Sequence, residues 1–527
     1  MTKQLLQYVL TCLPVFLSSF SIAQQKADIL ILNGRIVDGT GNPWYRADIA
    51  IRGNRIAAIG TLKTWQAARV IDAKAQIVAP GFIDVHTHIE GEEAENPQAT
   101  NFIYDGVTSV VTGNCGSSKT DIEKYYAWLD SLKLSINVGT LLGQNDVRRA
   151  VMGRANRDAS EDELKRMDSI VHKAMEEGAL GFSTGLIYIP GSYTPTYELV
   201  RLAKIVAAYG GIYATHMRNE GDSVVPAIKE ALQIGREANI PVEISHFKVS
   251  GQNNWGRSRE TLALVEAARR EGLDVTIDQY PYTASSTSLS TLLPDWALAD
   301  GQDSINARLA NPILRDSIKN IMKRNLAKRG QQHWEYAVVA YYRTDTTYNG
   351  KSIAAINTTL NRPNTTDAEA ELICLMMEQG GAGMVFHGMD ENDVTYFMRY
   401  PFNMFASDAS IRIFGRGAPH PRGYGTNARV LGRYVREQKV ITLEEAIRRM
   451  TSLPAQRFGL HDRGLLREGM SADIVVFDPE TVRDNSTFEK PHQYSSGFSY
   501  VLVNGAITLE SGNHNGTRNG EILYKRQ

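Results

Sequence analysis

The chain has 527 residues, of which 43% are hydrophobic and 22% are charged. This composition is typical of a globular protein, and the length exceeds one ordinary domain but suits a large barrel with an additional domain. Lys and Arg number 57 against 58 Asp and Glu, which gives a net charge of -1. This balance gives no electrostatic support for nucleic acid or an anionic membrane surface as a partner.

The first 23 residues predict a secretory signal peptide. Lys3 supplies a positive start, residues 9–17 form a short apolar core, and Ser21-Ile22-Ala23 places small residues where cleavage is determined. The core is too short for a membrane span, and no later stretch is long and apolar enough to be one. We therefore expect an exported protein, periplasmic or secreted, that is cleaved after Ala23. Lipidation at Cys12 is a minor alternative.

Short β segments separated by turns occupy both ends of the mature chain. Ile29-Leu30-Ile31-Leu32 is one example near the start, and Asp473-Ile474-Val475-Val476-Phe477 is another near the end. We expect residues 27–79 and 459–525 to form one small β-sandwich domain, through which the middle of the chain is inserted.

The middle of the chain alternates strands with amphipathic helices, which predicts an α/β fold with a parallel sheet. Eight strand-like segments favour a (β/α)8 TIM-like barrel over an open sheet. We expect the barrel over residues 80–284 and 381–458. Residues 285–380 are too many for one crossover, so they are expected to form an inserted subdomain or lid. The eight segments lie near 80–86, 108–112, 136–140, 179–185, 211–216, 241–246, 273–278 and 402–408.

Metal-binding side chains follow five of these strands. A lone histidine at a strand end is more often an ordinary polar residue. Six such residues together are different, because the carboxyl ends of barrel strands meet on the face where active sites form. Imidazole and thiolate are ligands that metals such as zinc accept. The residues are His86 and His88 after the first strand, Cys115 after the second, His216 and His246 after the fifth and sixth, and Asp408 after the eighth.

Cysteine use leaves two interpretations open at this point. Once the leader is removed, the cysteines are Cys115 and Cys374. In an oxidising compartment a disulfide is the default interpretation, and it competes with a metal-binding role for Cys115. Cys374 lies in a helical-looking apolar segment and is more simply a buried apolar residue.

A series of short motifs runs through the barrel segments in a fixed order. They are Gly81-Phe82-Ile83-Asp84-Val85-His86-Thr87-His88, Gly113-Asn114-Cys115-Gly116, Arg149-Ala150-Val151-Met152-Gly153, Phe182-Ser183-Thr184-Gly185-Leu186, Ala214-Thr215-His216-Met217-Arg218-Asn219-Glu220, Ile244-Ser245-His246-Phe247-Lys248, Asp278-Gln279-Tyr280-Pro281-Tyr282, Ser407-Asp408 and Pro419-His420-Pro421-Arg422. Together they resemble the D-aminoacylase (N-acyl-D-amino-acid deacylase) family of the metal-dependent amidohydrolase superfamily. The resemblance covers about residues 28–510.

The resemblance implies a zinc-dependent enzyme that hydrolyses the amide of N-acyl-D-amino acids to a carboxylate and a D-amino acid. It implies that Cys115, His216 and His246 hold one zinc tightly. His86 and His88, with Cys115 bridging, would form a second, weaker zinc site. Metal binding would also protect the thiol from disulfide formation.

Two further features bear on the chemistry. The resemblance makes Asp408 the catalytic base, which takes a proton from water and gives it to the leaving amine nitrogen. Many amidohydrolases with two metals bridge them with a carboxylated lysine on the fourth strand, but residues 181–185 contain no lysine. An anionic bridge would therefore come from Cys115.

The substrate residues implied by the resemblance are Lys248, Tyr282 and Arg422, which would hold the α-carboxylate. Arginine suits this role because its guanidinium contacts both carboxylate oxygens. Tyr188 and Ser286 are kept as further candidates, although packing roles are favoured for them. The loop at residues 411–417 is longer than the family pattern, which leaves the side-chain preference open. The histidines treated as non-ligands are His172, His387, His420 and His461, of which His420 is a candidate to orient a neighbour.

Two alternatives stay open beside this interpretation. One is a cyclic amidohydrolase of the hydantoinase or dihydroorotase kind, against which the absent fourth-strand lysine argues. The other is a catalytically inactive scaffold, which would be expected to lack ligands or the base. The acyl group, the oligomeric state and the number of metals in use are not determined by the sequence.

Overall fold

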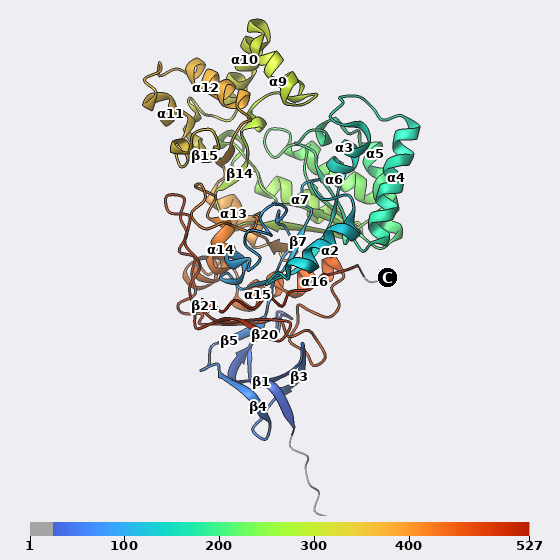
Figure 1. The fold of residues 1–527 in the computed structure, drawn as a ribbon, viewed down its shortest axis with the longest axis vertical. Coiled ribbons are helices and arrows are strands. Elements are labelled where there is room, and N and C mark those ends of the chain that lie inside the picture. The colour runs from blue at the N-terminus through green and yellow to red at the C-terminus, as the bar shows by residue number, and fades with distance from the viewer. Residues whose placement is uncertain (1–24, 526–527) are drawn as a thin grey trace, which may run out of the picture.

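The computed structural model describes residues 25–525, so the predicted signal peptide lies outside the described residues. Figure 1 shows three parts in line: a β-domain at one end, the barrel in the middle, and a largely helical insert at the other end. Within residues 25–525, no helix is long and apolar enough to cross a membrane.

Strands from both ends of the chain form the sheet of the β-domain. They are β1 (Lys26–Ile36), β2 (Tyr45–Arg52), β3 (Arg55–Gly60), β4 (Gln66–Asp72), β5 (Ile77–Pro80), β18 (Ile474–Phe477), β19 (Phe498–Val503), β20 (Ala506–Glu510) and β21 (Asn513–His514). The sheet order is β21-β20-β19-β18-β5-β1-β2-β3, with β4 paired to β1. Because β18 runs antiparallel to β5, the last part of the chain is hydrogen-bonded to the strand that leads into the barrel.

Each of the eight segments predicted for the barrel forms a strand. The strands are β6 (Phe82–Asp84), β7 (Val107–Thr112), β8 (Asn137–Thr140) with its continuation β9 (Leu142–Gly143), β10 (Gly181–Gly185), β11 (Ile212–His216), β12 (Val242–Ile244), β13 (Val275–Gln279) and β17 (Asn403–Phe405). The apolar run from Ile77 to Ile83 is divided at Gly81. Its first half belongs to the β-domain sheet and its second half to the barrel.

The barrel closes between its first and last strands. Strands β6-β7-β8 and β9-β10-β11-β12-β13-β17 are parallel ladders joined through the β8–β9 segment. On the opposite side Thr87 bridges Ala409 in parallel, Asp408 N donates to His86 O at 2.9 Å, and His88 N donates to Ala409 O at 2.9 Å. Closure therefore occurs at the residues that the sequence assigns to the site.

Amphipathic helices surround the barrel, as the sequence pattern predicts. Ser160 and Glu163 start α4 with a reciprocal capping box, in which each side chain accepts from the other residue's backbone N–H. The helices are α1 (Thr100–Ile103), α2 (Ile122–Leu132), α3 (Gln144–Met152), α4 (Glu161–Glu176), α5 (Thr196–Ala208), α6 (Val224–Ala238), α7 (Ser258–Arg270), α13 (Glu391–Met398), α14 (Arg422–Arg429) with the π-helical η6 (Val430–Glu437), α15 (Leu443–Met450) and α16 (Ser452–Phe458).

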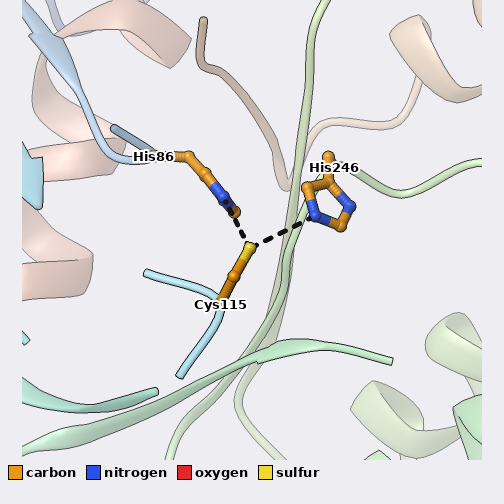
Figure 2. Close-up of side chains that lie close together, drawn as sticks. All are labelled: His86, Cys115 and His246. Carbon is orange, nitrogen blue, oxygen red and sulfur yellow. Dashed lines mark hydrogen bonds between the residues drawn. The ribbon is translucent and has the colours of Figure 1, made fainter. Parts of the chain in front are cut away.

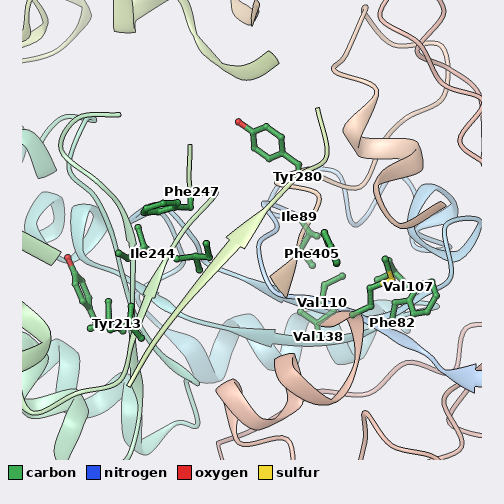
Figure 3. Packing of buried hydrophobic residues seen from close by; sticks show 14 of the residues in the cluster. Phe82, Ile89, Val107, Val110, Val138, Tyr213, Ile244, Phe247, Tyr280 and Phe405 are labelled. Carbon is green, nitrogen blue, oxygen red and sulfur yellow. The ribbon is translucent and has the colours of Figure 1, made fainter. Parts of the chain in front are cut away.

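Successive side chains along the barrel strands alternate between two apolar layers. Phe82 and Val110 belong to the large cluster between strands and helices, part of which is drawn in Figure 3. Their neighbours Ile83 and Val111 belong to another cluster, which includes Phe458 of α16. Successive residues of a strand point to opposite faces, so both faces of these strands are buried.

The insert has its own sheet and core. Its elements are β14 (Ala284–Ser288), α8 (Asp295–Leu298), α9 (Gln302–Ala310), α10 (Pro312–Lys328), β15 (Ala337–Tyr341), α11 (Ile353–Thr359), α12 (Thr366–Glu378) and β16 (Gly383–His387). The sheet order is β14-β16-β15, and the core includes Trp334 and Cys374. The sequence placed residues 381–387 in the barrel, but β16 pairs antiparallel with β14 and β15 and closes the insert.

Candidate active site

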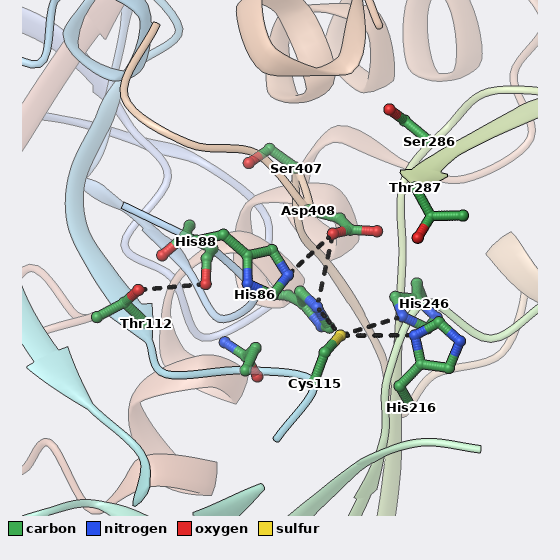
Figure 4. A network of polar contacts seen from close by, with 12 residues as sticks. His86, His88, Thr112, Cys115, His216, His246, Ser286, Thr287, Ser407 and Asp408 are labelled. Atoms are coloured by element: carbon green, nitrogen blue, oxygen red, sulfur yellow. Dashed lines mark hydrogen bonds and ion pairs between the residues drawn. The ribbon is translucent and has the colours of Figure 1, made fainter. Parts of the chain in front are cut away.

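Three of the predicted imidazole ligands converge on the sulfur atom of Cys115. The Cys115 Sγ lies 3.3 Å from His86 Nε2 and 3.6 Å from both His216 Nδ1 and His246 Nε2. These residues come from loops and strand ends far apart in the sequence, and their side chains point at one another (Figures 2 and 4). The structure thus brings together the sulfur and imidazoles that the sequence predicted.

Each of these sulfur–nitrogen distances fits a pair of ligands on one zinc ion. Zinc lies about 2.3 Å from thiolate sulfur and about 2.0–2.1 Å from imidazole nitrogen, so two ligands of one tetrahedral ion are about 3.5 Å apart. The measured sulfur–nitrogen distances are 3.3–3.6 Å. The described residues contain three overlapping groups of potential ligands: His86, Cys115 and His246; His86, His88 and Asp408; and His216, Glu220 and His246.

The surroundings of Cys115 favour the thiolate form of its side chain. Burial alone would raise the pKa of the thiol, but His86, with hydrogen bonds from His216 and His246, holds this pKa well below its usual value. Both Cys115 and Cys374 are free, and Cys374 is buried within the apolar core of the insert. The metal-binding interpretation of Cys115 therefore fits better than the disulfide.

The fourth barrel strand supports the loop that carries Cys115. Ser183 of β10 donates to Gly113 O, and its hydroxyl accepts from Gly116 N at 3.0 Å. Gly185 allows close approach, because a Cβ there would lie 2.1 Å from Cys115 O. Strand β10 has no lysine that could bridge two metals. It instead fixes the position of the Cys115 sulfur.

Three site residues have left-handed backbone conformations that residues other than glycine rarely adopt. The φ angles are 52° at Cys115, 34° at His246 and 50° at Asp408. Such conformations cost about 1–3 kcal/mol each and persist where surrounding contacts fix them. They aim the three side chains inward from loops that have just left their strands.

Asp408 faces the metal ligands and an arginine. Its Oδ1 lies 3.3 Å from His88 Nε2 and 3.7 Å from His86 Nε2, and its Oδ2 forms an ion pair with Arg422 Nη1 at 2.7 Å. Burial would raise the pKa of this carboxyl, but Arg422 and the histidines hold it well below its usual range. The carboxylate is therefore charged and able to accept a proton, as the predicted base requires.

Two buried carboxylates orient the imidazoles. Asp278, at the end of β13, lies 3.4 Å from His86 Nδ1 and accepts from His246 N at 2.8 Å. Glu220 lies 3.0 Å from His246 Nδ1 and 3.8 Å from His216 Nε2. Carboxylates behind ligating histidines fix the ring orientation. Both residues belong to sequence motifs recognised above, but no role was assigned to them, since most of their partners lie in other motifs.

Two of the predicted substrate residues lie near Tyr280, which the sequence analysis did not assign to the site. Arg422 lies 4.5 Å and Lys248 lies 5.7 Å from the centroid of the Tyr280 ring, and the buried Tyr280 hydroxyl has no hydrogen-bond partner among the described residues. Tyr282 instead packs against Phe488 and Arg429, outside the cavity. The structure therefore corrects the expectation for Tyr282 and places Tyr280 in the site.

His420 lies next to the substrate-binding residues and contacts the backbone of Arg422. It is fully buried, its Nε2 lies 2.9 Å from Ala284 O, and its Nδ1 accepts from Arg422 N at 3.0 Å. Among residues 25–525 it contacts none of the candidate metal ligands, and it positions the backbone of Arg422, a neighbour that it was a candidate to orient.

A cavity of about 840 Å³ joins the metal-binding group to the insert. Tyr188 and Ser286 both line it, and the Tyr188 hydroxyl lies 2.9 Å from Thr287 Oγ1. The insert contributes apolar side chains such as Trp334 and Phe386, which the sequence did not assign to the site. A cavity of this size and composition is typical of a small-molecule site.

Comparison with known proteins places this geometry in a family. The model of the amidohydrolase family matches residues 69–368 and 398–509. The chain belongs to this family. It is 37% identical over 526 residues to a D-aminoacylase from Alcaligenes xylosoxydans xylosoxydans, covering 95% of this chain and 98% of that one. It is 38% identical to an N-acyl-D-glutamate deacylase from the same organism, covering 92% and 94% of the two chains.

A solved structure shares the same fold. The crystal structure of N-acyl-D-glutamate deacylase from Bordetella bronchiseptica, complexed with zinc and a phosphonate that mimics the tetrahedral intermediate, superposes with a TM-score of 0.81. The two chains are 35% identical, and the match covers 95% of this chain and all of that one. The family and the barrel fold predicted from the motifs are confirmed.

Removing the central sulfur tests the metal-binding group. We expect Cys115→Ser to lose most of its bound metal, because a hydroxyl does not replace a thiolate among imidazoles. Metal content after dialysis, measured by mass spectrometry, gives the result without reference to activity. Cys374→Ala, in the core of the insert, is the matched control and should keep its metal. Equal metal content in both variants would contradict the assignment.

Proposed function

We propose that the protein is a zinc-dependent deacylase that hydrolyses the amide bond of N-acyl-D-amino acids to a carboxylate and a D-amino acid. The observation that carries the proposal is the convergence of Cys115 and three imidazoles beside Asp408. It occurs in a chain that matches a D-aminoacylase along nearly its full length. The zinc in the Bordetella enzyme supports zinc as the metal.

The proposed ligands divide into two positions. Cys115, His216 and His246 would hold the tightly bound zinc, and His86 and His88 would contribute to a weaker second position. When bound, zinc polarises the amide carbonyl and makes a water molecule more acidic. The sulfur lies within 3.6 Å of nitrogen atoms from both groups, which suits it to both positions.

Asp408 would move the protons. Its Oδ1 accepts a proton from the attacking water and then donates that proton to the leaving amide nitrogen. The ion pair with Arg422 keeps the carboxylate charged until water is in place. Only 9% of the Asp408 surface is exposed, so the buried environment limits access of other water to the carboxylate.

The α-carboxylate of the substrate would lie near Arg422, Lys248 and Tyr280. In the structure Arg422 is paired with Asp408, and Lys248 donates to Glu220 at 2.6 Å. Both cations can also contact a carboxylate that enters above the Tyr280 ring, whose hydroxyl is free to donate to it. These contacts would fix the amide over the metal-binding group.

The two alternatives have less support. A cyclic amidohydrolase with a lysine bridge would need that lysine on β10, where Ser183 instead holds the Cys115 loop. An inactive scaffold would have no reason to keep a charged base beside a complete ligand set.

Stereoselective turnover tests the proposed reaction. We expect the purified protein to release D-methionine from N-acetyl-D-methionine at least about 100-fold faster than L-methionine from the L-substrate, since one enantiomer aligns its amide with Asp408. Removal of metal by a chelator should abolish turnover, and added zinc should restore it. Preference for the L-substrate would refute the stereochemical assignment.

Replacing the base separates catalysis from metal binding. We expect Asp408→Asn to lower kcat by about 10²- to 10⁴-fold, because the amide cannot accept the proton from water. Its content of tightly bound zinc should stay near that of the wild type, because Cys115, His216 and His246 remain. Asp130→Asn, at an exposed position on α2, is the control for a charge change alone. Wild-type kcat in Asp408→Asn would remove it as the base.

We also propose that the protein is exported to the periplasm or secreted. The leader composition supports this proposal: Lys3, an apolar core and small residues before Gln24. Expression of the full chain in a Gram-negative host should yield mature protein beginning at Gln24 outside the cytoplasm, as measured by intact mass and cell fractionation. Full-length protein confined to the cytoplasm would contradict it.

A further inference from the structure

The hydrophobic core of the insert is open to the cavity. Several of its side chains are buried in that core and also line the cavity, where they form an apolar wall. They are Leu292, Leu293, Met322, Leu326, Trp334 and Phe386. The cavity therefore continues from the polar metal-binding group of the barrel to an apolar surface, to which the proposed reaction has so far given no role.

The loop after β10 connects the candidate ligand His216 with this apolar wall. The centroid of the Tyr188 ring lies 4.9 Å from that of the His216 ring. Tyr193, in the same loop, donates from its hydroxyl to Asp295 O of the insert at 3.0 Å. Leu292 shortly precedes Asp295 and belongs to the wall. An apolar group that starts beside His216 can therefore pass along Tyr188 onto the insert.

Helix α10 contributes two adjacent side chains to the wall and is attached to the barrel. Met322 and Leu326 are four residues apart, so they lie on one face of the helix. At the end of the helix, Arg329 O accepts from Gln252 N of the barrel at 3.2 Å. This bond holds the apolar face against the cavity. Methionine adapts its shape to an irregular apolar partner, which suits a surface that binds a flexible chain.

The proposed chemistry sets the direction in which the substrate lies. Asp408 belongs to the group of potential ligands with His86 and His88, whereas His216 belongs to a different group. Because Asp408 gives a proton to the leaving nitrogen, the amino-acid half of the substrate lies on the Asp408 side. An amide is planar and almost always trans, which places its two substituents at opposite ends. The acyl group therefore extends toward His216 and Tyr188.

We propose that the apolar wall binds the acyl group of the substrate, so that straight, apolar acyl chains longer than acetyl are preferred. The inference rests on the proposed deacylase function. The cavity of about 840 Å³ has space for such a chain beside the amino acid. Each methylene that leaves water against the wall strengthens binding. Hydrolysis adds one water across the carbon–nitrogen bond and releases a longer-chain carboxylate and the D-amino acid.

Two matched series of substrates test the position of the chain. The acyl series is N-acetyl-, N-butanoyl-, N-hexanoyl- and N-octanoyl-D-alanine. The side-chain series keeps the acetyl group and adds the same methylenes to the amino acid, as D-norvaline, D-2-aminoheptanoate and D-2-aminononanoate. We expect kcat/KM to rise about two- to fourfold for each methylene of the acyl series, and at least about 50-fold from acetyl to octanoyl. The side-chain series should rise less.

Variants then assign the preference to the apolar wall. Leu326→Ala should lower the octanoyl-to-acetyl ratio of kcat/KM about three- to tenfold, because the chain loses apolar contacts. Leu309→Ala, in the same core but outside the lining of the cavity, is the matched control and should keep the wild-type ratio. If Leu326→Ala fails to fold, as judged by thermal melting, Leu292→Trp still decides. Its added bulk narrows the cavity and should lower the same ratio.

Three outcomes would overturn the inference. Equal or falling kcat/KM along the acyl series would show that the wall does not bind the acyl chain. A gain confined to the side-chain series would assign the wall to the amino-acid side chain. A wild-type ratio in folded Leu326→Ala and Leu292→Trp would place the chain elsewhere. Hydrolysis of none of these D-substrates, acetyl included, by metal-loaded wild type would instead refute the deacylase function, on which the inference rests.

Discussion

The site depends on how the barrel closes. Asp408 N donates to His86 O and His88 N donates to Ala409 O, so the first and last strands meet through the segments that carry two imidazoles and the carboxylate. Parallel strands deliver their carboxyl ends to one face, and closure makes the first and eighth ends neighbours. Residues 86 and 408, separated by most of the chain, thereby act as one unit.

A cation explains the rest of the local electrostatics. The Cys115 thiolate, Asp408, Glu220 and Asp278 place negative charge in a buried volume. Against the effect of burial, the charges of Cys115, Asp278 and Asp408 raise the pKa of His86 well above its usual value. Lys248 and Arg422 neutralise only part of that charge. Ligands with this geometry and charge favour a divalent metal, and the support by Ser183 and the left-handed backbone at Cys115 keep them in place.

The sequence predicted the strands and ligands because both follow local patterns. Strand ends are visible as apolar runs that stop at polar residues, and a barrel turns that order into proximity. Tyr282 shows where this reasoning ends. Its N donates to Tyr280 O at 3.0 Å, so the chain turns at Pro281 and the second tyrosine leaves the site. Beyond the last residue of a strand, the alternation of side chains between the two faces no longer predicts where a side chain points.

By itself, the sequence determined the barrel with its β-domain and insert, the metal-binding residue types and Asp408, since each is written in periodicity or in a motif. Only the tertiary structure decided which carboxylates orient the histidines and which tyrosine faces the cavity. These depend on contacts between segments distant along the chain, whose directions are set by packing and by loop conformations rather than by neighbouring residues.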